Sequence, residues 1–228
     1  MRNIWFTIYT GSVENYSGIA NYRTLLEKLL ISVIQDKINR EKKIQKYILM
    51  FSNNIEVDNI ELFKDLHYEK KVRDGIVSLD VSTKHIDWNN LSEQEKKDFL
   101  IEKWKVLFNN LSDDYFLTDK SEVIASLEDL KTQEWRITSS PFKKKVKYNK
   151  ENYSVVIDLS TQRAQLALVR DSDQEWYALR DFETSMIHTN AYFKGFTLEG
   201  DKLTFLYKNF FNAMFKSPPV FNLKECIV

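Results

Sequence analysis

The spacing of apolar side chains predicts a strand at the start of the chain and a long helix after it. Residues 4–9 alternate between two faces, with the period of two that a strand shows when its sides meet different environments. From Ala20 to about Asn39, apolar side chains recur three or four positions apart, as on one face of a helix. These side chains are Tyr22, Leu25, Leu26, Leu29, Leu30, Val33, Ile34 and Ile38. A short apolar run at 47–51 then predicts a buried strand.

Two further strands are predicted at 62–68 and 76–81, joined by the charged turn 69–75. Ser92 is followed three positions later by Glu95, which is the pattern of a capping box. In a capping box the serine hydroxyl and the glutamate carboxylate each satisfy one free amide at a helix start. A helix is therefore expected to begin at Ser92.

A third helix is expected from Ser121 to Lys131, started by Asp119. The apolar stripes of these helices predict much of the core, which includes Leu26, Leu29, Ile34 and Trp104. The other aromatic side chains expected in the core are Trp5, Phe205 and Phe210. Three tryptophans flank predicted turns, which makes them candidates for exposed anchors, although a core position is favoured for most aromatic residues. They are Trp88, Trp135 and Trp176.

The second half of the chain changes to the pattern of strands. Strands are expected at 153–159, 164–170, 175–180, 192–198 and 203–207. Short turns that contain Ser, Asp or Gly separate them, so the pattern predicts an antiparallel meander.

The change from helices to strands predicts a boundary between residues 138 and 139, where Ser139-Ser140-Pro141 meets a run of lysines. The predicted fold class is α+β. Its N-terminal β-α-β-β-α portion covers residues 1–138, and its C-terminal antiparallel β-meander covers 139–228. The two portions are expected to form either two subdomains or one continuous domain.

Composition indicates a soluble protein of a bacterial cytoplasm. The 228 residues balance 33 Lys and Arg against 33 Asp and Glu, so no net charge draws the molecule to nucleic acid or to a membrane. The single Cys226 fits a reducing compartment. The apolar stretch at the start is short and lacks a cleavage site, and no segment reaches the ~18 apolar residues of a membrane span. We expect no cofactor and no membrane partner.

The candidate residues for catalysis form no convincing motif. His67, His85 and His188 lack a second ligand at the spacing of a metal site, so we expect no metal. The strongest enzyme alternative is a metal-dependent nuclease or related hydrolase, with Asp80 and Asp158 near strand ends holding Mg²⁺.

A basic run offers a further alternative, a structural or nucleic-acid-binding module. It contains Lys143, Lys144, Lys145, Lys147 and Lys150. Phe142 and Tyr148 lie within it, as in basic-aromatic nucleic-acid sites. Acidic stretches flank the run on both sides, so a solvated interdomain turn is the favoured interpretation, and we do not expect nucleic acid as the partner.

The first half of the chain resembles immunity proteins of bacterial polymorphic-toxin and contact-dependent growth inhibition systems. The resemblance rests on the order of the elements: the Trp5-Phe6 strand, the long helix, the turn 68–74, the strand 77–81 and the helix from Ser92. It implies a protein that binds and neutralises a cognate toxin, for example a nuclease, in a toxin-antitoxin complex and without catalysis. The resemblance carries over no functional residue.

The expected toxin-binding surface is a group of carboxylates in the meander, here called the acidic edge. It consists of Asp171, Asp173, Glu175, Asp181 and Glu183. An acidic edge suits the basic cleft of a toxin that cuts nucleic acid, where it takes the place of the phosphates. The alternative is a solvated edge whose charge deters strand pairing.

Overall fold

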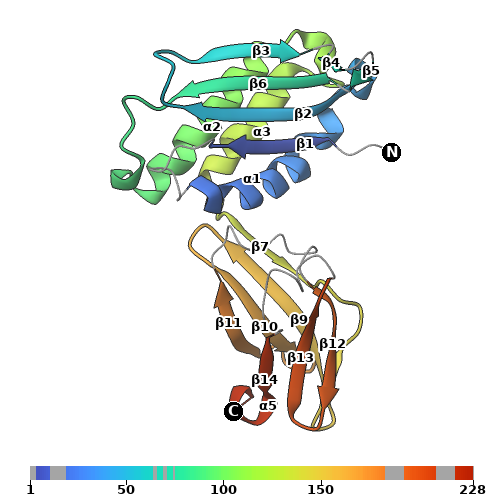
Figure 1. The fold of residues 1–228 in the computed structure, drawn as a ribbon. Coiled ribbons are helices and arrows are strands. Elements are labelled where there is room, and N and C mark those ends of the chain that lie inside the picture. Colours follow the sequence, from blue (N-terminus) through green and yellow to red (C-terminus); the bar gives the residue numbers. More distant parts are fainter. Residues whose placement is uncertain are drawn as a thin grey trace. The chain divides into compact units, whose positions relative to one another are not determined.

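A computed structural model of the chain describes residues 4–10, 19–63, 66–68, 71–73, 75–182, 193–208 and 219–227. Its helices and sheets form an α+β fold, which confirms the predicted class (Figure 1). The chain divides into two compact units, Met1–Trp135 and Arg136–Val228. This division lies close to the boundary expected after residue 138.

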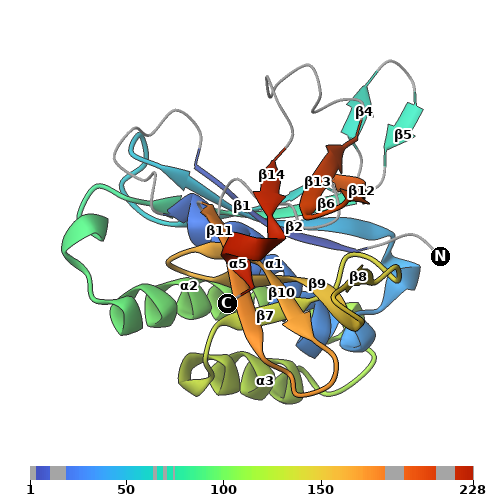
Figure 2. The same cartoon turned by 90° about the horizontal axis from the view of Figure 1, so that it is seen from below.

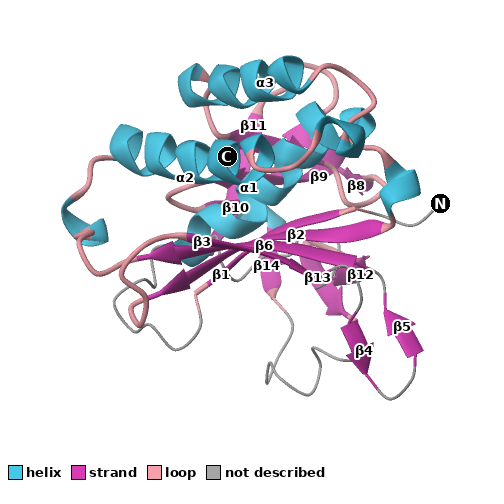
Figure 3. Ribbon diagram, turned by 90° about the horizontal axis from the view of Figure 1, so that it is seen from above, coloured by secondary structure: helices cyan, strands magenta, loops and turns pink. Residues whose placement is uncertain are grey.

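The first unit contains a four-stranded sheet in the order β1-β2-β6-β3. Its strands are β1 (Trp5–Tyr9), β2 (Ile44–Ser52), β6 (Gly75–Ser82) and β3 (Asn59–Phe63). β2 pairs in parallel with both β1 and β6, whereas β3 is antiparallel to β6. The helix α1 (Ile19–Ile34) makes the crossover that parallel strands require. Figure 3 shows α1, α2 (Glu93–Asn109) and α3 (Lys120–Thr132) on one face of this sheet.

α1 ends at Ile34, so the prediction of a helix as far as Asn39 is wrong at its end. A 3-10 turn, η2 (Gln35–Lys37), follows the helix. The amide of Asn39 then donates to the carbonyl of Tyr115 at 2.8 Å. Because this amide is bonded to a distant segment, it does not continue the helical hydrogen-bond ladder. The described residues of this unit contain three other 3-10 turns, η3 (Arg40–Lys42), η4 (Trp88–Asn90) and η5 (Asp113–Tyr115).

The region between β2 and β6 differs from its prediction. The expected strand 62–68 is divided, since β3 ends at Phe63 and β4 (Leu66–Tyr68) is a separate strand. β4 pairs with β5 (Lys71–Arg73), which lies within the segment expected to be a turn. The sequence analysis missed this short hairpin because its charged residues have the composition of a turn.

Aromatic side chains fill the space between the sheet and its helices. Phe6 stacks on Tyr47 with ring centres 5.5 Å apart and meets Trp104 edge-on at 6.0 Å. Trp88 and Trp135 are also buried, although each flanks a predicted turn. Trp88, Trp104 and Trp135 are therefore all core residues.

The apolar stripe of α1 is narrower than its sequence suggests. Leu25, Leu26, Leu30 and Ile34 are buried against the core. Leu29 is only half-buried, so its prediction as a core residue is wrong. It lies at the margin of the stripe, where the helix surface turns toward solvent.

The strands described in the second unit form two antiparallel sheets. The larger has the order β11-β10-β9-β7, and β8 also pairs with β9. Its strands are β7 (Arg136–Ser139), β8 (Val146–Tyr148), β9 (Glu151–Ser160), β10 (Ala164–Arg170) and β11 (Trp176–Phe182). The smaller sheet contains β12 (Phe193–Glu199), β13 (Lys202–Tyr207) and β14 (Val220–Asn222). β14 leads directly into the short helix α5 (Leu223–Cys226) (Figure 2).

The five strands predicted for this half are all present, with small shifts at their ends. The single meander that the sequence predicts is divided into β9-β10-β11 and β12-β13-β14, and three short strands were not predicted. Phe142 lies between β7 and β8. Its ring centre is 5.7 Å from that of Phe196 and 6.5 Å from that of Phe205, both in the smaller sheet. Phe205 is buried as predicted, and Phe210 lies outside the described residues.

Candidate protein-binding surfaces

The acidic edge lies on the hairpin formed by β10 and β11. Asp171 and Asp173 are in its turn, and Glu175 immediately precedes β11. Asp181 lies near the opposite end of β11, the outermost strand of the larger sheet. Glu183 lies outside the described residues. The structure therefore brings three of these carboxylates together at the turn and leaves the fourth at the far end of the strand.

Arg170 forms ion pairs with two of the carboxylates in the turn. Its guanidinium donates to Asp173, with Nη2 at 2.6 Å from Oδ2, and also to Glu175. The guanidinium lowers the pKa of Asp173 from its ordinary value of 3.8 to about 2. The hydroxyl of Tyr177 donates to Glu175 at 2.5 Å, and this hydrogen bond raises the pKa of Tyr177 to about 12.

The other two described carboxylates are also paired. Asp171 accepts hydrogen bonds from Lys145 at 3.1 Å and from Ser154 at 2.9 Å, and the bond from Lys145 lowers the pKa of Asp171. Asp181 accepts from Arg163 at 3.1 Å and from Gln165 at 2.8 Å. The four described carboxylates thus face three cations, Lys145, Arg163 and Arg170. The acidic edge is an ion-paired surface with a small negative excess.

A second candidate surface lies on the sheet of the first unit. Trp5 is 53% exposed and Tyr9 is 56% exposed, and both belong to β1 at the edge of the sheet. Because Phe6 points to the helices, the alternation of the strand directs Trp5 and Tyr9 to the opposite face. The half-buried Ile48 and Met50 of β2 lie beside them, in register with Thr7 and Tyr9. Trp5, Tyr9, Ile48 and Met50 are called the aromatic face below.

The sequence placed Trp5 in the core, which is wrong. Both sides of residues 4–9 carry large apolar side chains, so alternation separates the two faces without telling which one the helices cover. The composition of the two sides could have told which side faces the helices. One side has Ile4, Phe6 and Ile8, whereas the other has two aromatic residues of the kind that can face water with a polar atom.

The residues of the nuclease alternative lie in different units. Asp80 is on β6 of the first unit, and Asp158 is on β9 of the second. The buried carboxylate of Asp158 accepts hydrogen bonds from Arg136 at 2.8 Å and Thr138 at 2.9 Å, so neighbouring strands already use it. Within the described ranges, no three His, Cys, Asp or Glu side chains gather as a metal site.

The remaining candidates are dispersed. His85 is exposed, nothing is described of the His67 side chain, and His188 lies outside the described residues. Trp176 is the exposed one of the three tryptophans near turns, at 37%. The lysine run does not lie at the boundary between the units, as the favoured interpretation required, but on and around β8.

Comparison with known protein families, characterised proteins and solved structures gives no match for this chain. In the described part of the chain, none of the helices combines the length and apolar composition that crossing a membrane requires.

Proposed function

We propose that this protein binds another protein through the aromatic face, and that it is a cytoplasmic immunity protein that neutralises a cognate bacterial toxin. The exposure of Trp5 and Tyr9, on the same face of an edge strand with Thr7 between them, is the observation that carries the proposal. Such a protein acts by occupying its partner, and it needs no catalytic residues of its own.

The chemistry of the aromatic face suits a protein partner. Tryptophan and tyrosine are enriched among the residues that dominate binding energy, because each covers a large apolar area and keeps one polar atom for a hydrogen bond. Met50 adds an adaptable apolar side chain beside Tyr9. Lys46 is in register with Trp5 and is exposed, which supplies a charge at the rim of the patch.

The position of the patch at a sheet edge supports the same conclusion. β1 pairs only with β2 among the described strands, so no described strand occupies its other side, and that side suits the addition of a strand. The resemblance to immunity proteins begins with this same Trp5-Phe6 strand. The partner we propose presents an apolar surface with an extended segment at its border.

The test uses the protein encoded beside this one, expressed with it and separated by gel filtration. We expect a 1:1 complex, no turnover of the toxin's substrate by this protein alone, and protection of cells that express the toxin. Trp5→Ala and Tyr9→Ala should each weaken binding by about 2 kcal/mol, or about 30-fold.

Leu117→Ala provides a matched control, because Leu117 is 64% exposed in the same unit and lies outside the aromatic face. Its affinity should stay unchanged. Loss of binding in all three variants would exclude a specific role for the aromatic face, and the absence of any complex would exclude the proposed function.

A further inference from the structure

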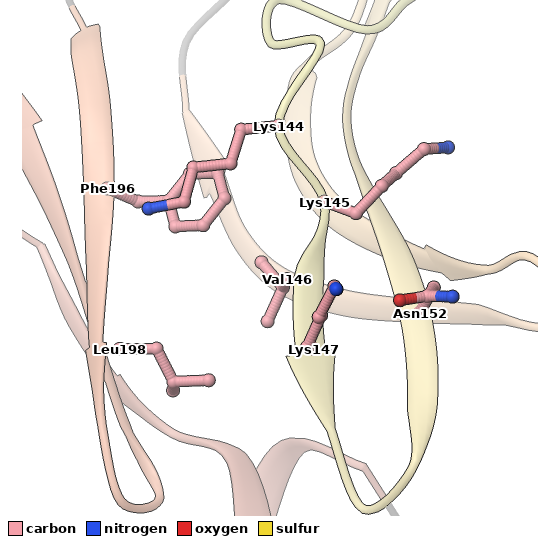
Figure 4. Close-up of a pocket in the computed structure, with 7 residues that line it drawn as sticks. All are labelled: Lys144, Lys145, Val146, Lys147, Asn152, Phe196 and Leu198. Carbon is pink, nitrogen blue, oxygen red and sulfur yellow. The ribbon is translucent and has the colours of Figure 1, made fainter.

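The larger sheet of the second unit has one face toward the smaller sheet and one face away from it. On β8, the hydroxyl of Tyr148 donates at 2.9 Å to Asp201, the residue before β13, so the side of β8 with Tyr148 faces the smaller sheet. Lys147 and Asn152 are paired across β8 and β9 and lie on the opposite side. Figure 4 shows both of them on this hairpin, apart from Phe196 of β12. The side with Lys147 and Asn152 is called the outer face below.

The register of the strands places Trp176 on this outer face. Trp176 pairs with Val169 on β10, and Val169 pairs with Ser154 on β9. Because Ser154 is two positions from Asn152, its side chain leaves the same face of β9. Trp176 is the exposed tryptophan among the three near turns, and the aromatic face of the first unit does not include it.

A hydrogen bond holds the indole of Trp176 along the sheet. Its Nε1 donates to Oε1 of Gln165 at 2.9 Å, although Gln165 is four positions from Val169, the partner of Trp176 on β10. The side chain therefore reaches along β10 past Ala167, whose small methyl group is completely buried. Since Trp176 stays partly exposed, a fixed aromatic surface is available to a ligand, and a ligand that binds there has little ordering of the protein to oppose it.

Polar side chains continue from the indole across the outer face. Nε2 of Gln165 donates to Oδ1 of Asp181 at 2.8 Å, and Nη1 of Arg163 donates to Oδ2 of Asp181 at 3.1 Å. One strand further, Asp158 pairs with Gln165 and accepts a hydrogen bond from Arg136 at 2.8 Å. The side chains of Arg163, Asp181 and Arg136 are half-exposed. They present donors and acceptors to solvent beside the aromatic ring.

These groups suit a neutral ligand that is rich in hydroxyls. Each guanidinium is neutralised by a carboxylate, Asp181 for Arg163 and Asp158 for Arg136, so this part of the face has no net charge. A sugar ring with equatorial hydroxyls has flat sides of C–H groups, which the π face of an indole attracts, and a rim of hydroxyls that donate and accept at once. A protein partner would instead require a larger apolar centre with few charges.

We propose that the outer face binds a neutral oligosaccharide, with one sugar ring stacked on Trp176 and its hydroxyls bonded to Asp181 and Arg163. A cello- or chito-oligosaccharide fits, because its chain is flat and can extend across the strands toward Arg136. This inference concerns the second unit and is independent of the proposed function, which rests on the aromatic face of the first unit.

NMR titration tests the proposal with cellotetraose, fully N-acetylated chitotetraose and a short single-stranded oligonucleotide as probes. The chain has five tryptophans, and the indole N–H signal that is missing in Trp176→Phe identifies the signal of Trp176. We expect one of the two sugars to shift this signal with a Kd of about 1 mM or lower. Binding of neither sugar at about 10 mM would overturn the proposal. Tighter binding of the oligonucleotide than of both sugars would also overturn it, in favour of bases stacked on the indole.

Trp176→Ala should weaken the tighter sugar at least about tenfold, because it removes the stacking surface. Arg163→Ala should weaken it about three- to tenfold, and it leaves the core untouched because Arg163 lies in the turn between β9 and β10. Affinities of the variants are obtained from the backbone amide signals of β10, whose dispersion also shows whether each variant is folded. If Trp176→Ala does not fold, Arg163→Ala decides.

Val220→Ala is the matched control, because Val220 is an exposed apolar residue of the same unit and belongs to the smaller sheet. The control should bind within about twofold of the unchanged protein. Unchanged affinity in either folded variant would overturn the assigned site, and so would an equal loss in the control.

Discussion

Ser92 and Glu95 exchange hydrogen bonds at the start of α2. The amide of Ser92 donates to Oε2 of Glu95 at 2.7 Å, and the amide of Glu95 donates to Oγ of Ser92 at 3.3 Å. The capping box predicted from the sequence is confirmed. It fixes where α2 begins, and the buried Leu100, Trp104 and Leu107 of that helix follow in phase.

Ser92→Ala should lower the free energy of unfolding by about 1 kcal/mol, because the amide of Glu95 loses its side-chain acceptor. Chemical denaturation measures this change. Ser92→Thr retains a hydroxyl and should restore most of the loss. An unchanged midpoint for Ser92→Ala would contradict a stabilising role for the cap.

Leu26 and Leu29 provide a test of the orientation of α1. Leu26 is buried, so Leu26→Ala should cost about 2 to 5 kcal/mol through lost burial and the cavity that remains. Leu29 is half-buried, so Leu29→Ala should cost on the order of 1 kcal/mol. Equal losses in the two variants would mean that the helix is rotated about its axis relative to this structure.

The sequence predicted elements well where their local signals were strong. The helix cap at Ser92 depends on residues within one turn, and the long strand β9 alternates between apolar and polar side chains over most of its length, apart from Val156. Such signals are independent of the rest of the chain. They gave the α+β class and the start of α2.

The failures arise where distant parts of the chain decide the outcome. Asn39 leaves the helical pattern because of its hydrogen bond to Tyr115, and nothing near Asn39 in sequence reveals that partner. β8 has the alternation of a strand, with Val146 and Tyr148 buried on either side of Lys147. The strand is only three residues long and lies within a run of lysines, so its alternation was too short to recognise. Lys144 meets Phe196 of β12 only in the folded chain, so charge alone could not separate this arrangement from a solvated turn.

The pair formed by Arg170 and Asp173 predicts how the β10–β11 hairpin responds to acid. The pKa of Asp173 is lowered in the folded protein, so its contribution to stability is complete above its ordinary pKa of 3.8 and is lost as the pH falls toward about 2. Hydrogen exchange of the hairpin amides should show less protection in Asp173→Asn than in the unchanged protein at pH 5. The difference should shrink as the pH approaches 2, and a constant difference across this interval would contradict the assigned pair.

The acidic edge gives the last prediction, which concerns the rate at which the toxin partner associates. Four described carboxylates face three cations, so the local excess is one negative charge, 4 − 3 = 1. Asp171→Asn, Asp173→Asn and Glu175→Gln together would turn this excess into two positive charges. A basic cleft on the partner would then be repelled, and association would slow by about two- to fivefold at low salt, while added salt would speed it instead of slowing it.

Neutral amides are preferable to lysines in this variant, because lysines would crowd against Arg170 and unfold the turn for reasons unrelated to binding. Glu199→Gln is the control, since Glu199 is an exposed carboxylate of the same unit that forms no ion pair with a described residue. Stopped-flow association rates at several salt concentrations separate electrostatic attraction from contact. Trp5→Ala should act differently, by speeding dissociation, because a lost apolar contact changes the lifetime of a complex more than the approach to it. Unchanged rates in the triple variant, with dissociation still accelerated in Trp5→Ala, would exclude the acidic edge and leave the aromatic face as the binding surface.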